Sequence, residues 1–152
     1  MSKTLSVNAI DSGTVIDHIP AGQAIRMIHL LKLANHKNQV TIGVNLKSKT
    51  GLKDLIKMEN RHLSERESHE IAIFAPEATV NIIEEFKVVK KYRVSAPEKI
   101  VGIFVCPTPS CISNHEPKGS VFFINNKQQR IRLQCKYCER LFDREDIKDY
   151  AS

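Results

Sequence analysis

The sequence has 152 residues, of which 41% are hydrophobic, and a formal net charge of +6. No apolar run approaches the roughly 18 residues that a membrane-spanning helix needs, so we expect no residence in a membrane. Met1 to Asn8 lacks the basic start and apolar stretch of an export signal, and we therefore expect a cytoplasmic, reducing environment.

The positive charge is divided evenly along the chain. Residues 1–98 carry 14 Lys and Arg against 11 Asp and Glu, and residues 99–152 carry 9 against 6, which leaves +3 in each part. Four thiolates around one divalent cation would bring the second part close to neutral. Since no concentrated basic stripe remains, the charge pattern speaks against a nucleic-acid partner.

The first part begins with strand patterns. Residues 5–9 alternate between apolar and polar side chains, and residues 11–13 form a turn into an apolar strand over residues 14–19. Asp17 and His18 interrupt that strand, so we expect one of them to face inward. A satisfied structural pair is the common explanation for such residues.

A helix and two strands follow. The spacing of apolar residues predicts a helix over residues 21–33. Residues 39–46 alternate strictly and are predicted as a strand, and a second strand is expected from about residue 53 to residue 59. The predicted buried face of the helix consists of Ala21, Ala24, Ile25, Ile28 and Leu31.

A second helix is predicted to begin at a capping box. Ser64 and Glu67 have the spacing at which each side chain accepts a hydrogen bond from the backbone N–H of the other. This helix should bury Ile71 and Phe74. It should end just before Pro76, because proline disfavours helical geometry in the residue that precedes it.

The order of these elements predicts the fold of the first part. Two more strands are expected over residues 78–83 and 86–94. Strand, helix, strand, strand, helix, strand is typical of an α+β ferredoxin-like sandwich, an antiparallel sheet with two helices on one face. Residues 95–98 read as a linker, so we predict one domain over residues 1–97 and a second over residues 98–152.

The second part is predicted to be a small all-β, zinc-ribbon-like domain. Its apolar runs are short, at residues 100–105, 121–124 and 131–133, and lie between turn-like clusters. About 50 residues bury little apolar surface, and a structural metal compensates for this in many small domains.

Four cysteines in this part form two closely spaced pairs. Cys106 and Cys111 are separated by four residues, and Cys135 and Cys138 by two. Each pair can place two sulfurs on one metal, and sulfur ligands favour zinc or iron over magnesium or calcium. Zinc is the preferred interpretation, with iron and four unliganded thiols as alternatives. A complete set of four sulfurs predicts one structural Zn²⁺.

The residues of the first part form no convincing catalytic constellation, so no catalytic residue is predicted. Lys57 and Lys91 lie among apolar residues of expected strands. Such ammonium groups can bind phosphate if the fold brings them together. Solvated strand lysines are the plainer interpretation.

Five blocks of the sequence resemble, in order, the regulatory chain family of aspartate carbamoyltransferase. They are Gly13-Thr-Val-Ile-Asp-His-Ile-Pro20, Thr41-Ile-Gly-Val-Asn-Leu46, Lys53-Asp-Leu-Ile-Lys-Met-Glu-Asn60, Ala75-Pro-Glu-Ala-Thr-Val-Asn81, and the Cys106 to Cys138 pattern with its Cys-Lys-Tyr-Cys.

The resemblance implies a regulatory subunit without catalytic activity. In that family, regulatory dimers join trimers of catalytic chains into a dodecamer of six catalytic and six regulatory chains, which makes carbamoyl aspartate for pyrimidine biosynthesis. The first domain binds CTP or ATP, with UTP assisting in some members, and the zinc domain contacts the catalytic chain. The resemblance places nucleotide contacts at Val7, Asn8, Ala9, Ile10, Asp17, His18, Lys57, Asn81, Ile83, Val88 and Lys91.

Several positions depart from the family pattern. Asn8 stands where an acidic residue is common and Phe86 where a tyrosine is, and both bear on nucleotide preference. Thr108 and Ser110 stand where asparagines can occur, although Glu139 can still serve the contact with the catalytic chain.

Two other functions compete with this interpretation. A zinc-ribbon nucleic-acid-binding protein is favoured by the pI near 9.2 and by Lys136, Arg140 and Arg144 near the metal, and the even charge distribution speaks against it. An enzyme acting on nucleotides would need a nucleophile or base that the sequence does not display.

Overall fold

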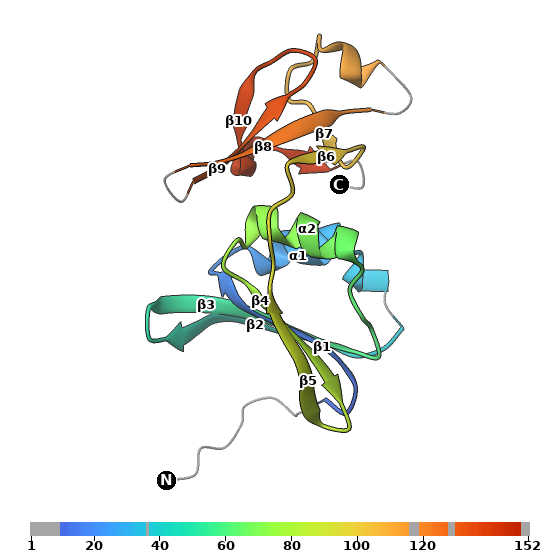
Figure 1. Cartoon of the computed structure of the whole chain (residues 1–152), viewed down its shortest axis with the longest axis vertical. Coiled ribbons are helices and arrows are strands. Elements are labelled where there is room, and N and C mark those ends of the chain that lie inside the picture. The colour runs from blue at the N-terminus through green and yellow to red at the C-terminus, as the bar shows by residue number, and fades with distance from the viewer. Residues whose placement is uncertain (1–9, 36, 116–118, 128–129, 150–152) are drawn as a thin grey trace. The chain divides into compact units, whose positions relative to one another are not determined.

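The computed structural model describes residues 10–35, 37–115, 119–127 and 130–149. The strand expected over residues 5–9 lies outside this range. The chain divides into two compact units, Met1–Val94 and Ser95–Ser152, each with its own sheet (Figure 1). Among the described residues, no helix has the length and apolar character required to cross a membrane.

The first unit is built on a five-stranded antiparallel sheet. Its strands lie in the order β2-β3-β1-β4-β5, and helices α1 and α2 cover one face (Figure 1). This is the ferredoxin-like order, with β5 added as a hairpin partner of β4, so the predicted α+β sandwich is confirmed. The bounds are β1 Gly13–Pro20, α1 Ala24–Leu30, η1 Leu33–Asn35, β2 Val40–Ser48, β3 Gly51–Glu59, α2 Glu65–Phe74, β4 Thr79–Glu84 and β5 Lys87–Arg93.

The core lies between the sheet and the two helices. Ile16 of β1 pairs with Ile56 of β3 and with Val80 of β4, and all three side chains are completely buried. Ile71 and Phe74 of α2 are buried as predicted. Because antiparallel partners share a face, this row fixes which side of each strand meets the helices.

Helix α1 differs from its prediction in length and in buried face. It spans only Ala24–Leu30, and Met27 is completely buried whereas Ile25 is 59% exposed. Ala21, predicted to be buried, is exposed and precedes Gly22, whose φ of 93° no helix accommodates. The predicted face is therefore confirmed only in part: Ala24 and Leu31 are buried, Ile28 is half-buried, and Ala21 and Ile25 are exposed.

Neither Asp17 nor His18 faces the core, contrary to the prediction. A β-bulge lies between Ile16 and Ile19, and both isoleucines are completely buried. His18 adopts a φ of 59°, which adds one residue to the strand without reversing its inward face. The bulge therefore leaves both polar side chains free of the core.

Helix α2 begins and ends as predicted. The Ser64 hydroxyl accepts from the Glu67 N–H at 3.1 Å, and the Glu67 carboxylate accepts from the Ser64 N–H at 3.1 Å. The helix ends at Phe74, two residues before Pro76. The capping box is therefore confirmed.

The second unit is an all-β structure that holds the four cysteines, as predicted. Four strands form a sheet in the order β10-β9-β8-β6, and β11 pairs with β7. The run over residues 100–105 forms two strands in different sheets, because the chain turns at Gly102 with a φ of 72°. The bounds are β6 Lys99–Val101, β7 Phe104–Val105, η2 Ile112–Asn114, β8 Val121–Lys127, β9 Arg130–Cys135, β10 Leu141–Asp143, η3 Arg144–Asp146 and β11 Lys148–Asp149.

Candidate functional site

The four cysteines of the second unit converge on one point. Their Sγ atoms all lie within 4.8 Å of one another, and the Cys106–Cys138 and Cys111–Cys135 pairs are each 3.7 Å apart. A tetrahedron of metal–sulfur bonds near 2.3 Å has edges of about 3.8 Å. The donor set and its spacing therefore fit a single tetrahedral metal ion.

The loop that carries the first cysteine pair is held in shape by hydrogen bonds. The Asn114 amide donates to the carbonyl oxygens of Cys106 at 3.1 Å and Thr108 at 2.7 Å. The Cys111 N–H donates to the Thr108 carbonyl at 3.0 Å. These bonds shape the loop that carries both sulfurs.

The pKa values of the Cys106 and Cys111 thiols are shifted in this cluster. Burial raises the pKa of Cys106 to about 12, helped by the neighbouring sulfurs. Burial also acts to raise the pKa of Cys111, but the Ser113 hydroxyl and N–H outweigh it and lower that pKa to about 7. Four thiolates this close repel one another, and a bound divalent cation removes that cost.

The first unit places three candidate residues in one row on the face of the sheet opposite the helices. Lys57 pairs with Val15, Val15 with Asn81, and Asn81 with Lys91, across β3, β1, β4 and β5. Since Ile16 faces the helices, its neighbour Val15 and the whole row face the other way. Two ammonium groups thus flank an amide on the face we call the open face.

Two apolar candidates, Ile83 and Val88, lie where β4 and β5 meet at their connecting turn. Ile83 pairs with Val88 beyond a bulge, and Ile83 is buried whereas Val88 is 57% exposed. Ile10, which precedes β1, is buried. The candidates Val7, Asn8 and Ala9 lie outside the described residues.

The β4–β5 turn next to Val88 is locally strained. Glu85 and Phe86 have φ values of 50° and 65°, a two-residue turn in which Asn and Gly are the favoured residues. The Phe86 ring is 66% exposed, and its N–H donates to the Asp11 carbonyl at 2.9 Å. Strain of this kind clusters at functional sites.

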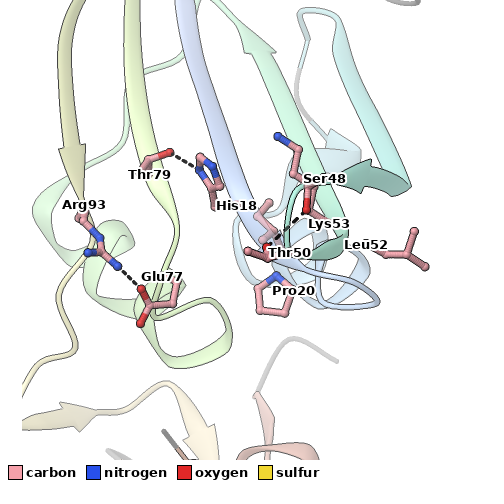
Figure 2. A pocket seen from close by; sticks show the side chains of 10 residues that line it. His18, Pro20, Ser48, Thr50, Leu52, Lys53, Glu77, Thr79 and Arg93 are labelled. Atoms are coloured by element: carbon pink, nitrogen blue, oxygen red, sulfur yellow. Dashed lines mark hydrogen bonds and ion pairs between the residues drawn. The ribbon is translucent and has the colours of Figure 1, made fainter.

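Asp17 and His18 lie at the other end of β1. The Lys53 ammonium contacts the Asp17 carboxylate at 2.8 Å. His18 Nδ1 lies 3.1 Å from the Thr79 hydroxyl (Figure 2). Burial acts to raise the pKa of Asp17, but Lys53 and the His18 N–H outweigh it and hold that pKa below its usual value. His18 and Lys53 also line a pocket of about 480 Å³, together with Arg93 (Figure 2).

The structure brings two further residues into this set. Val15 stands between Lys57 and Asn81 in the row, and Lys53 holds Asp17. Side chains alternate along β3, so Lys53 lies on the same face as Lys57. This alternation could have identified Lys53 as a site residue from the sequence. The whole arrangement presents cations, an amide and apolar side chains on one surface, which suits an anionic ligand with a planar apolar group.

The sequence matches two family models. Residues 5–95 match the allosteric domain of the aspartate carbamoyltransferase regulatory chain, and residues 98–148 match its metal binding domain.

Relatives with that name cover nearly the whole chain. The regulatory chain of Chromobacterium violaceum is 46% identical over 98% of this chain and 99% of its own length, and that of Tolumonas auensis is 48% identical over 97% and 96%. That of Yersinia enterocolitica is 49% identical over 94% of each. A solved chain from the MjSpt4:Spt5 complex is 13% identical over 91% of this chain and 99% of its own. Its TM-score of 0.21 is too low to indicate a shared fold.

The two matched domains correspond to the unit with the open face and to the unit with the four cysteines, and the relatives are regulatory rather than catalytic subunits. The chain therefore belongs to the aspartate carbamoyltransferase regulatory chain family, with an allosteric domain followed by a metal-binding domain.

Proposed function

We propose that the chain binds CTP or ATP, with UTP as a possible second ligand of that class, on the open face of the first unit and thereby controls the catalytic chains of aspartate carbamoyltransferase in pyrimidine biosynthesis. The observation that carries this proposal is the row of Lys57, Asn81 and Lys91 across three neighbouring pairs of strands. A nucleoside triphosphate offers the negative charge and the planar base that such a surface suits.

The proposed ligand spans the open face. Lys91 is exposed on β5, and His18 and Lys53 lie at the pocket near the other end of β1, so two ammonium groups and an imidazole are available for phosphate and ribose oxygens. Ile83, Val88 and the strained turn at Phe86 offer apolar surface and backbone groups for the base. Ile10, Asp17 and the segment of Val7, Asn8 and Ala9 complete the proposed site.

The metal of the second unit is proposed to be one structural Zn²⁺ on Cys106, Cys111, Cys135 and Cys138. All four positions of a tetrahedron would be filled by sulfur, so the ion would hold the two cysteine loops together rather than activate water. The loop with Thr108 and Ser110, together with Glu139, is proposed to contact a catalytic chain. Assembly would give the family's dodecamer of six catalytic and six regulatory chains in the cytoplasm.

A second copy of the chain is proposed to pair along strand β2. This edge strand is nine residues long and carries one charged side chain, Lys47, while Ile42 and Val44 are 40% and 45% exposed. The opposite edge, β5, carries four cations in seven residues, and such charge protects an edge from pairing. A two-fold axis beside β2 would join two sheets into one regulatory dimer.

Control of activity is proposed to follow from differential binding. A nucleotide that binds one quaternary state more tightly than the other shifts their populations, typically by 1–3 kcal/mol of coupling. The catalytic residues would lie entirely on the partner chain.

Removing the metal should unfold the second unit alone. A structural zinc supplies on the order of 10 kcal/mol to a domain of this size, so chelation should abolish the amide protection of residues 99–135 while β1 to β5 keep theirs. Elemental analysis should find about one zinc per chain, and Cys138→Ser should reproduce the loss. Protection that survives complete chelation, or iron in place of zinc, would contradict the proposal.

Lys91→Ala should weaken CTP binding by about tenfold, because a charge-assisted contact to an anionic ligand is worth roughly 1.5–3 kcal/mol. Isothermal calorimetry on the full chain measures this directly. The matched control is Lys87→Ala, which removes a lysine of the same strand outside the row and should leave affinity unchanged. Equal affinity of Lys91→Ala and the wild type would place the ligand elsewhere.

Val44→Lys should convert the isolated chain from dimer to monomer, because it places a charge in the proposed β2 contact. Sedimentation equilibrium reports the change in mass. Val89→Lys alters a similarly exposed valine on the β5 edge and should stay dimeric. A monomeric wild type, or dissociation caused by the β5 substitution, would show that β2 is not the contact.

A further inference from the structure

Strand β3 carries two adjacent charged residues that act on opposite faces of the sheet. Lys53 lies on the open face, where its ammonium contacts Asp17 of β1 at 2.8 Å. Asp54 lies on the helix side and is completely buried. Because successive side chains of a strand alternate, one dipeptide reaches both surfaces of the sheet.

The two strands that pair with β3, β1 and β2, each contain a β-bulge next to Lys53 and Asp54. On β1 the register shifts between Ile16 and Ile19, and the latter is paired with Asp54. On β2 the register shifts between Gly43 and Leu46, and Leu46 is paired with Lys53. Each bulge contains a residue of positive φ, His18 at 59° and Asn45 at 58°. Paired bulges of this kind need side chains that hold them.

The Asp54 carboxylate holds one bulge and the start of a helix. One of its oxygens accepts from the Asn45 N–H at 3.0 Å. The other accepts from the N–H groups of Gly22 at 2.9 Å and Ala24 at 3.2 Å. These three donors satisfy a carboxylate that has no access to solvent. The β2 bulge and the entry into α1 therefore depend on a single side chain.

We infer that Lys53 and Asp54 couple the open face to the β2 edge, with Asp54 as a positioning residue. Asp54 fixes β3 against the β2 bulge and α1, and this fixes Lys53 beside Asp17 and His18. An anionic group that draws the Lys53 ammonium away from Asp17 loosens the β1 bulge. Because Lys53 is adjacent to Asp54 on β3, the same displacement loosens the β2 bulge at Asn45. Coupling of this kind is reciprocal. The ligand in this inference is that of the proposed function, but the coupling itself can be measured without it.

The first test is amide hydrogen exchange on the full, metal-loaded chain without ligand. Lys53→Gln removes the contact with Asp17, and the N–H groups of Asn45 and Gly22 should then exchange about fivefold faster or more. Lys57→Gln, on the same face of the same strand, should leave both rates unchanged. Unchanged rates in Lys53→Gln would overturn the coupling.

The second test is CTP binding by calorimetry to Asp54→Asn and Asp54→Glu. A positioning role predicts that both weaken binding, by about fivefold or more, because each disturbs the carboxylate that fixes Lys53. Ser64→Ala removes a helix cap of the same unit and should leave affinity unchanged.

The two Asp54 variants separate positioning from charge. If Asp54 acted only through its negative charge, Asp54→Asn would tighten binding of the anion and Asp54→Glu would leave it unchanged, and that pattern would overturn the inference. A wild-type chain that binds no CTP would contradict the proposed function instead, and the exchange rates would still decide the coupling.

Discussion

The register of β1 between β3 and β4 is the constraint on which the candidate site depends. Ile16 meets Ile56 and Val80 on the helix side, and this packing fixes the opposite orientation for Val15 and its partners. Shifting one strand by a single residue would turn its polar side chains toward the core and its apolar ones toward solvent. The core of the first unit thus positions Lys57, Asn81 and Lys91 on the open face.

The second unit depends on its cysteine cluster because its apolar core is small. Its described residues form six short strands in two small sheets, and three of the four cysteines are buried. Apolar burial on this scale contributes little against chain entropy, so the sulfur cluster takes the place of a larger core. With a metal bound, the two cysteine loops would keep their shape in a way that free loops of this length would not.

Local patterns predicted the sandwich, the capping box and the cysteine cluster, because each depends on residues close in sequence or on spacing alone. The start of α1 and the burial of Ala21 and Ile25 were predicted wrongly, because the N–H of Ala24 is bound by Asp54, thirty residues further along the chain. The orientation of Asp17 and His18 was also wrong, because the bulge between Ile16 and Ile19 lets two successive residues face away from the core, which strict alternation forbids. Lys53 was missed as a site residue for a similar reason, since its partner Asp17 comes from another strand.

Regulation by this chain, as we propose it, requires that nucleotide binding to its first domain change the activity of a separate catalytic chain. The most direct measurement mixes the metal-loaded chain with catalytic trimers of aspartate carbamoyltransferase and follows their co-migration and their activity with and without CTP or ATP. We expect a stable complex whose activity responds to nucleotide, while trimers alone do not respond. A complex that forms but is indifferent to every nucleotide, or trimers that never bind the chain, would contradict the proposed regulation.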